Sequence, residues 1–526
     1  MYINYKTING IEYGTVMKSV RNGSSVSKAD QVYLGRVIDK DKLIFKNREH
    51  GLFVYDLSTN SYTPVDANYA EPNIARKNQK PVRSNLIVSF GDMFFLNEYI
   101  HKIGFDKAID AIGYANMDTL YALLAYYILC PLSNCHAEDW WDLTYAKLLY
   151  PNAKLASQRI SNALADIGSE EAKRNFFKEY TAFLRKAKTE NEAAASVENG
   201  ILIDSSGLPN SSHMHVTAVN NHNGVVSEEI RLIYVVQQKT GLPLFFRYVP
   251  GNVIDASTVT RTIAELKANG IDTKFAILDA GYYSGKNADT LLDAKVSFMS
   301  RMKSNFSLYK SIVDEHLAGL ETRDNLVRFN NRLVYVKRVE CKIGQNNDRD
   351  AYAYLCKDLN MMHELERKLV ERAEDDGMSS EEIYDVLQSQ GIFIIISTRK
   401  IAKESLLELY YTRDQVEKLF KISKQNSKIL PINIETEETL RGHLMITFMA
   451  TALLKLMSDK LKKTSLTTDS MFMNLHEQHA NIYENELITT EPTKKMNDAY
   501  KAFKITCPVS IPLKGGAVVD PKTNGN

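Results

Sequence analysis

Residues 199–303 alternate strand-like and helix-like segments, and this alternation restricts that part of the chain to an α/β fold. Three segments rich in β-branched and aromatic residues predict antiparallel strands, namely "GILIDSSGLP", "EEIRLIYVVQ" and "PLFFRYVP". Two helical segments then alternate with two further strands, in the order "ASTVTRTIAELKANG", "TKFAILDAGYYSG", "KNADTLLDA" and "KVSFMSRMK". The segment "GIFIIIST" at 391–398 predicts one more buried strand.

The chain has 526 residues, too many for one hydrophobic core, so we expect several domains. Composition and periodicity divide it into a β-rich segment (1–63), a proline-containing linker (64–84), a helical domain (85–190), the first part of an α/β core (199–303), a mainly β insertion (304–390), the last part of the core (391–457), and a helical C-terminal region with a disordered tail (458–526). A charged helix is expected at 359–376. The helical domain is either a DNA-binding unit or an ordinary bundle with a solvated basic face.

Composition narrows the class of protein. The net charge of +1 means that any surface for nucleic acid must be local. Five scattered cysteines are too few for a disulfide framework, and Cys130, Cys135 and His136 lack a second pair at zinc spacing, so we expect reduced thiols. The start lacks the apolar core of a signal peptide, and the longest apolar runs, Leu120–Leu132 and Leu444–Leu454, fall short of the roughly 20 residues of a membrane helix. We therefore expect a cytoplasmic protein without a membrane partner.

The segment "YYTRDQVEKLFKISK" places Tyr410, Arg413, Glu417 and Lys424 on one helical face. At about 100° per residue they form a polar stripe about 60° wide. The simplest explanation of such a stripe is a solvated face with an Arg413–Glu417 ion pair. Two carboxylates elsewhere in the chain favour a functional explanation instead.

Asp204 and Asp279 each end an apolar strand of the predicted core. One such aspartate alone is commonly a turn residue. If the two strands are neighbours, the carboxylates converge at one edge of the sheet, where a helix could add Glu417. Three carboxylates repel one another unless they surround hard cations, and their oxygens suit Mg²⁺ or Mn²⁺. Two such ions about 3.5–4 Å apart can promote phosphodiester cleavage.

These residues resemble the signature of the DDE transposases of bacterial insertion sequences. Tyr410, Arg413, Glu417 and Lys424 fit the pattern Tyr-x2-Arg-x3-Glu-x6-Lys without a gap. The strand "ILIDSS" is similar to the first Asp block of that family, and "ILDAGYYS" is similar to the second. The segment "RGHLMITFMA" also looks like the helix that follows the signature. The resemblance covers roughly residues 199–457 well and the N-terminal segment more loosely.

The resemblance implies a ribonuclease H-like catalytic core that a mainly β insertion divides between Asp279 and Glu417. Asp204, Asp279 and Glu417 are then the catalytic residues and the ligands of two Mg²⁺ ions, for which Mn²⁺ can substitute. The intervals fit, with 75 positions between the two aspartates and 138 from Asp279 to Glu417.

The resemblance also implies DNA contacts on the same helix. Tyr410, Arg413 and Lys424 are expected to bind phosphates near the cleaved end, together with Lys421. Residues 399–428 support this expectation with eight basic and four acidic residues, although a solvated face would explain the same charges.

The implied reaction is hydrolysis at transposon ends followed by strand transfer. The implied partners are double-stranded DNA, as terminal inverted repeats and target, and a second copy of the chain in a homodimer. The implied location is the nucleoid of a bacterial cytoplasm. Two alternatives remain open, namely a non-catalytic DNA-binding descendant and a structure-specific nuclease of the same fold.

One feature departs from the pattern of some relatives, in which an insertion-domain tryptophan stacks on a flipped base. Here both tryptophans, Trp140 and Trp141, precede the core. Phe329, Tyr335 or Tyr352 of the insertion is an alternative base-stacking residue, but a role in the core of the insertion is the expectation for each. Whether cleavage passes through a DNA hairpin is therefore left open by the sequence.

Overall fold

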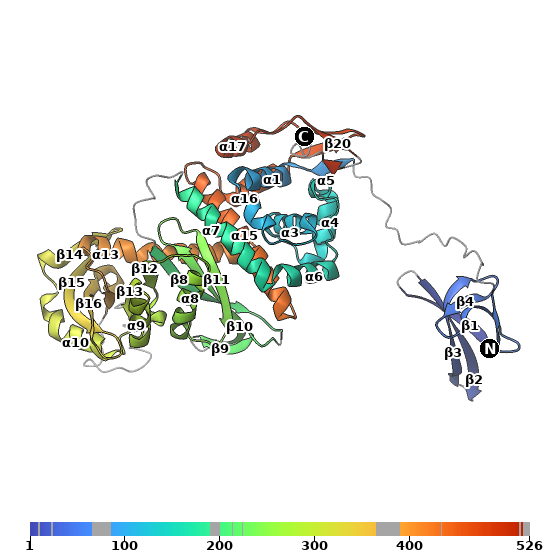
Figure 1. Cartoon of the computed structure of the whole chain (residues 1–526), viewed down its shortest axis with the longest axis horizontal. Coiled ribbons are helices and arrows are strands. Elements are labelled where there is room, and N and C mark those ends of the chain that lie inside the picture. The colour runs from blue at the N-terminus through green and yellow to red at the C-terminus, as the bar shows by residue number, and fades with distance from the viewer. Residues whose placement is uncertain are drawn as a thin grey trace. The chain divides into compact units, whose positions relative to one another are not determined.

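The computed structural model describes residues 1–8, 11–22, 25–65, 86–189, 200–212, 214–222, 225–363, 390–432, 434–514 and 517–518. The chain divides into two compact units, residues 1–85 and 86–526 (Figure 1). Most of the predicted linker lies outside the described residues. So do the charged helix expected at 359–376, beyond residue 363, and the last eight residues of the expected disordered tail.

The first unit contains an antiparallel sheet in which each strand pairs with the next along the chain. Its strands are β1 (Tyr2–Ile8), β2 (Ile11–Asn22), β3 (Ser25–Asp39), β4 (Ile44–Asn47), β5 (Gly51–Asp56) and β6 (Ser61–Pro64). Phe45 and Phe53 are fully buried in its core. Gly35 has φ of +94° next to a register shift between β2 and β3, and a Cβ there would lie 2.3 Å from the Lys46 carbonyl oxygen. Only glycine fits that position.

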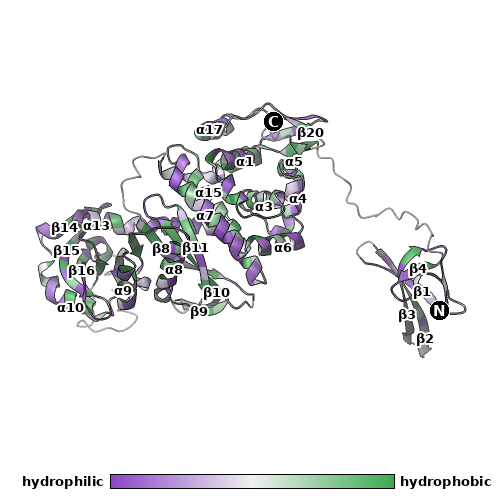
Figure 2. Cartoon of the chain, viewed as in Figure 1, coloured by the Kyte–Doolittle hydropathy of each residue, from purple (hydrophilic) through white to green (hydrophobic). Residues whose placement is uncertain are grey.

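The second unit is built on a ten-stranded sheet with the order β11-β10-β8-β12-β13-β17-β16-β15-β14, and β9 pairs with β10 beside this path. The strands are β8 (Gly200–Pro209), β9 (Ala218–His222), β10 (Val225–Gln237), β11 (Pro243–Pro250), β12 (Phe275–Leu278), β13 (Ser297–Met302), β14 (Leu326–Phe329), β15 (Arg332–Ile343), β16 (Arg349–Asp358) and β17 (Ile392–Ser397). Figure 2 shows hydrophobic residues along β8 and β11. The mixed α/β class predicted from the sequence is confirmed.

Strands β8, β10 and β11 are antiparallel neighbours, as predicted, and β12 pairs with β8 in parallel. The prediction that the first strand ends at Asp204 is wrong. Strand β8 continues to Pro209 because Ser205–Pro209 pair with β10, from Ile233 to Glu229. Asp204 therefore lies within a strand, whereas Asp279 directly follows one.

The strands of the insertion join the same sheet. β17 pairs with β13 on one side and with β16 on the other, so β14–β16 extend the core sheet. The sequence predicted these strands by their alternation but not this continuation. All six residues of β17 are buried, which explains why the segment is almost uniformly apolar.

A long helix, α15 (Glu437–Leu461), forms the centre of the helical part. It contacts α3 (Met117–Leu129), α6 (Ser157–Ile167) and α14 (Asp414–Asn426). Among the described residues, α15 alone is long and apolar enough to cross a membrane, but 89% of its most apolar window is buried inside the protein. It is therefore the core helix of this unit.

The other helices of this part are α1 (Gly91–Ile103), α2 (Asp106–Asp110), α4 (Ala137–Leu143), α5 (Ala146–Leu149) and α7 (Glu170–Thr189). They follow the predicted helical segments, including the break near Gly168. Gly168 and Gly442 allow α6 and α15 to approach closely, since a Cβ on Gly442 would lie 1.8 Å from the Leu164 carbonyl oxygen.

The prediction that residues 458–526 are helical is wrong in part. Two helices, α16 (Thr468–His476) and α17 (Lys494–Phe503), accompany four strands, β18 (His479–Ile482), β19 (Glu486–Thr489), β20 (Ser510–Lys514) and β21 (Ala517–Val518). These strands form a sheet with β7 (Ile87–Ser89), in which His479 pairs with Ser89. Strands of two to five residues have little local periodicity, and β18 pairs with β7 near the other end of this unit's sequence, so the sequence did not reveal them.

Candidate active site

The two predicted aspartates lie on adjacent parallel strands. Ile203 of β8 is opposite Leu278 of β12, so Asp204 and Asp279 follow at the same end of the pair. The sheet order explains this position, because β12 returns beside β8 after the crossover helix α8 (Val259–Ala268). The condition set from the sequence, that the two strands be neighbours, is met.

Arg413 bridges the two carboxylates. Its Nη2 lies 3.4 Å from Asp204 Oδ2, and its Nη1 lies 3.1 Å from Asp279 Oδ1. The Arg413 side chain is 16% exposed, and its Nε has no hydrogen-bond partner among the described residues. One guanidinium thus neutralises two acids that would otherwise repel each other.

Burial controls the ionisation of this pair. It raises the pKa of Asp204 to about 6, and the charges of Asp279 and Asp255 act in the same direction. Arg413 and the Ser205 backbone N–H, which donates to Asp204 Oδ1 at 2.9 Å, partly offset the rise. Burial also disfavours the charge on Arg413, but the neighbouring Asp279, Tyr410 and Asp204 hold the pKa of Arg413 above its usual range.

The signature segment is not one continuous α-helix. Helix α13 (Lys403–Tyr410) ends before a tighter turn at Tyr411–Arg413, and α14 begins at Asp414. The Thr412 hydroxyl donates to the Leu409 carbonyl at 2.7 Å in this turn. The stripe deduced from uniform helical spacing is therefore approximate.

Tyr410 and Arg413 face the protein rather than the solvent. Tyr410 is 4% exposed, and Arg413 Nη1 approaches its hydroxyl at 3.5 Å. Burial raises the pKa of Tyr410. A solvated stripe is thus excluded for these two residues.

The later part of the signature is more open. Glu417 and Lys421 are exposed on α14, while Lys424 is half-buried and donates to the Ser206 hydroxyl at 2.8 Å and the Gly207 carbonyl at 3.2 Å. Lys424 thereby attaches α14 to β8, the strand that carries Asp204. Burial lowers the pKa of Lys424.

The structure brings together two of the three expected metal ligands. Among the described residues, no group of three or more His, Cys, Asp or Glu side chains is arranged to hold a metal ion. The guanidinium of Arg413 lies between Asp204 and Asp279, and Glu417 points into solvent.

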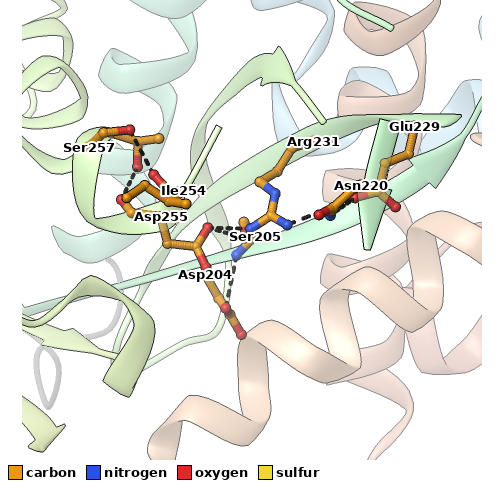
Figure 3. A network of polar contacts seen from close by, with 9 residues as sticks. Asp204, Ser205, Asn220, Glu229, Arg231, Ile254, Asp255 and Ser257 are labelled. Carbon is orange, nitrogen blue, oxygen red and sulfur yellow. Dashed lines mark hydrogen bonds and ion pairs between the residues drawn. The ribbon is translucent and has the colours of Figure 1, made fainter. Parts of the chain in front are cut away.

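A second polar network lies beside Asp204 (Figure 3). The Arg231 Nη1 of β10 donates to Asp255 Oδ1 at 2.9 Å, and the Ser205 hydroxyl donates to the same oxygen at 2.6 Å. Arg231 Nη2 also lies 3.8 Å from Glu229, which accepts a hydrogen bond from Asn220. The network fixes Ser205, the residue that follows Asp204 in the chain.

Sequence reasoning missed this network. Its signal was available, because Arg231 interrupts the apolar strand "EEIRLIYVVQ" and is only 7% exposed. A buried guanidinium needs acidic partners, and their existence could have been predicted. Asp255 as one partner could not, since it lies in the turn between β11 and α8, where nothing in the pattern of the sequence distinguishes it.

A basic cavity of about 480 Å³ adjoins Asp279. Ala280, Arg301, Lys303 and Tyr309 contribute to its lining, and the Arg301 guanidinium lies 4.9 Å from the centre of the Phe393 ring. Arg301 lies near the end of β13 and Lys303 directly follows it, where the sequence indicated positive charge. The site therefore combines a carboxylate pair with nearby cations.

The three aromatic residues singled out in the insertion all have packing contacts. Phe329 stacks on Tyr411 with ring centroids 5.1 Å apart, and Tyr335 and Tyr352 pack against the hydrophobic core. This agrees with the expected role in the core. Through Phe329, the insertion supports the turn that carries Arg413.

Comparison with known proteins identifies the domain that contains the site. Residues 195–453 match the family model described as the transposase DDE domain, which includes β8, β12 and α14. The chain has no match among curated proteins. Among solved structures it is similar to a piggyBac transposase in a synaptic complex with hairpin DNA, at 10% identity and a TM-score of 0.38, over 73% of this chain and 79% of that chain.

Proposed function

Because residues 195–453 belong to the transposase DDE domain family, we propose that this chain is the DNA transposase of an insertion sequence. It hydrolyses a phosphodiester at each transposon end and joins the freed 3′ hydroxyl to target DNA. The observation that carries this proposal is the pair of Asp204 and Asp279 on adjacent parallel strands, bridged by the guanidinium of the signature residue Arg413.

We further propose a ribonuclease H-like catalytic core. The order β11-β10-β8-β12-β13 supports it, since three antiparallel strands are followed by two strands parallel to β8. This order also places both aspartates at one level of the sheet, because each directly follows the paired residues Ile203 of β8 and Leu278 of β12.

The residues present fit divalent metal ions, which DDE transposases generally use. Asp204 and Asp279 already share one cation, the Arg413 guanidinium, and their oxygens are the ligands that Mg²⁺ or Mn²⁺ prefers. Glu417 is the proposed third ligand, on the same short segment as Arg413. When bound, two such ions supply the charge that stabilises the attacking and leaving oxygens.

The remaining signature residues act on DNA phosphates. In the free protein, Arg413 binds the two carboxylates, and a phosphate offers the same bidentate geometry to its guanidinium. Tyr410 fixes Arg413 from one side, and Lys424 and Lys421 extend the positive surface along α14. These side chains orient the scissile phosphate over the aspartates.

Two displacements follow at the oriented phosphate. In the first, a water oxygen attacks phosphorus and the bond to the 3′ oxygen breaks, which leaves a 3′ hydroxyl and a 5′ phosphate. In the second, this 3′ hydroxyl attacks a target phosphodiester and releases a target 3′ hydroxyl. Joining two ends requires two sites, so we propose a homodimer on DNA that acts at the bacterial nucleoid.

The test is cleavage of DNA that carries the gene with its native flanks, in Mg²⁺, by the wild type and by Asp279→Asn. Nicks or excision at the flanks, and joined product, are expected only with the wild type. Asp272→Asn is the matched control, since Asp272 is an exposed aspartate just before β12. Cleavage without joined product would indicate a structure-specific nuclease, and binding without cleavage a non-catalytic descendant.

A further inference from the structure

The tip of the β14–β15 hairpin, residues 329–332, presents an aromatic ring and a guanidinium as a pair. Asn330 and Asn331, the two residues of its turn, have φ of +43° and +61°. Two successive positive φ angles are typical of the type I′ turn of two-residue hairpins, in which asparagine is favoured. Phe329 is accordingly paired with Arg332 across the hairpin, so both side chains point to the same face.

This pair contacts Tyr411, the first residue of the turn between α13 and α14. The rings of Phe329 and Tyr411 are stacked, with planes at 16°. The guanidinium carbon of Arg332 lies 5.0 Å from the centre of the Tyr411 ring and 5.4 Å from that of Phe329. Ring stacking and a guanidinium over a ring each add attraction beyond the burial of apolar area. The hairpin tip therefore fixes Tyr411 by two kinds of contact.

Arg332 is itself anchored within the insertion. Its Nη1 lies 3.1 Å from Oδ2 of Asp358, whose side chain is 2% exposed. Oδ1 of Asp358 accepts hydrogen bonds from the backbone N–H groups of Asn360 and Met361, at 3.0 and 3.1 Å. A buried carboxylate with these partners restricts the positions that the guanidinium can adopt.

The start of α13 is attached to the insertion as well. The Tyr354 hydroxyl of β16 donates to the Ile401 carbonyl at 2.9 Å and accepts from the Ile401 N–H at 2.6 Å. Helix α13 thus has one attachment shortly before its first residue and another at Tyr411, directly after its last residue. Both attachments come from strands that extend the core sheet beyond β17.

Side-chain contacts continue from Tyr411 to the carboxylate pair. The rings of Tyr410 and Tyr411 meet edge to face with centroids 5.7 Å apart. The Arg413 guanidinium lies 5.8 Å from the centre of the Tyr410 ring and bridges Asp204 and Asp279. Consecutive contacts therefore link the hairpin tip to the proposed catalytic site.

We propose that Phe329 and Arg332 are positioning residues, which fix the Tyr411–Arg413 turn so that the Arg413 guanidinium stays on the two aspartates. The inference rests on the proposed function, because that function gives the aspartates their catalytic role. It deepens that function by assigning the mainly β insertion a task in the reaction, namely to orient the guanidinium that meets the scissile phosphate.

The test measures how fast phenylglyoxal, a reagent for guanidinium groups, labels Arg413 in the full-length chain without metal or DNA. Peptide mass spectrometry gives the rate for each arginine. Arg332→Gln and Tyr411→Leu should each increase the rate at Arg413 about two- to fivefold, since each removes ring contacts that keep the guanidinium on the carboxylates. Tyr411→Phe keeps the ring and should keep the wild-type rate.

Two controls separate positioning from a general loss of structure. Arg338→Gln is the matched variant, since Arg338 lies on the same strand with its guanidinium 6.0 Å from the centre of the Tyr352 ring, and it should leave the rate at Arg413 unchanged. Arg231, which is 7% exposed, is the internal reference. Equal acceleration at Arg231 and Arg413, or no acceleration at Arg413, would overturn the proposal.

Cleavage provides a second measurement. Arg332→Gln should reduce the rate of DNA cleavage and leave the affinity for duplex DNA in chelator unchanged, because its effect falls on orientation rather than on binding. Unchanged cleavage in a variant with faster labelling of Arg413 would overturn the positioning role. Faster labelling in a chain whose wild type does not cleave DNA would instead contradict the proposed function, while the contacts from the hairpin tip to Arg413 would be confirmed.

Discussion

Two arginine–aspartate groups contact neighbouring residues of β8, one at Asp204 and the other at Ser205, and they differ in how completely they are enclosed. The Arg231 side chain is 8% exposed, with Asp255 at 21% and Glu229 at 6%. The Arg413 side chain is 16% exposed, with Asp204 at 17% but Asp279 at 42%. The first group is closed, and the second opens to solvent at Asp279.

This difference indicates that the closed group stabilises the fold, whereas in the open group another cation can replace the guanidinium beside the carboxylates. In the closed group, Asp255 also accepts a hydrogen bond from Ser205, and Glu229 accepts one from Asn220. In the open group, the single guanidinium of Arg413 faces two carboxylates, and burial raises the pKa of Asp204 to about 6. Each group contains one guanidinium and two carboxylates, so the groups differ in the solvent exposure of these side chains and not in their chemistry.

Substitution of Glu417, the proposed third metal ligand, should have the largest effect. It should reduce activity without changing the stability of the fold. Glu417→Gln is expected to reduce cleavage at least about a thousandfold, because a lost metal ligand removes several kcal/mol of transition-state stabilisation. Its melting temperature should not change, since Glu417 is exposed. Glu408→Gln, at an exposed position of α13, is the control, and equal activity of the two variants would contradict the assignment.

The closed group should show the opposite pattern. Arg231→Gln is expected to lower the free energy of unfolding by about 3 kcal/mol or more, because it leaves buried carboxylates without their cation. Arg413→Gln should lower it by only about 1 kcal/mol, since Asp279 remains hydrated and Asp204 can take up a proton. Denaturant unfolding of both variants compares these values, and a larger loss for Arg413→Gln would reverse the comparison.

The raised pKa of Asp204 predicts the effect of pH on metal binding. Asp204 is ionised above its pKa of about 6 and takes up a proton as the pH falls through that value, so Mn²⁺ affinity should fall below it. In Arg413→Gln the midpoint should move to higher pH, because the guanidinium holds the pKa of Asp204 down. Calorimetric titrations over a pH series test this, with Lys418→Gln as the control on the same helix. An unchanged midpoint in Arg413→Gln would show that the guanidinium does not act on Asp204.

The smallest effect is expected at the exposed end of the signature. Lys421→Gln should reduce the salt slope of DNA binding by about 1 and change the free energy of unfolding by less than about 0.5 kcal/mol. Anisotropy over a salt series and thermal melting measure the two quantities. A loss of stability as large as that of Arg231→Gln would instead show that Lys421 stabilises the fold.

The sequence was sufficient for features that depend on local spacing. The three antiparallel strands β8, β10 and β11 were predicted from their composition, and the two aspartates were expected to converge on the condition that β8 and β12 are neighbours, which they are. The burial of Tyr410 and Arg413 against the protein did not follow, because helical spacing alone describes a polar stripe without saying what it faces.

Features that depend on contacts between distant segments could not be predicted from the sequence. The pair of Arg231 with Asp255 joins a strand to a turn, and the strand of His479 pairs with that of Ser89. Such contacts depend on how whole elements pack, which periodicity does not encode. The turn at Tyr411–Arg413 was missed for a related reason, since a 3-10 segment needs no change in composition.

The most direct test of the central claim is calorimetric Mn²⁺ binding by the wild type, Asp279→Asn and Asp255→Asn at alkaline pH. The two substitutions are chemically identical and lie on either side of Asp204, one in the open group and one in the closed group. Loss of Mn²⁺ binding in Asp279→Asn and its retention in folded Asp255→Asn is the predicted result. Retention in Asp279→Asn, with loss in folded Asp255→Asn, would contradict the assignment of the open group as the catalytic site.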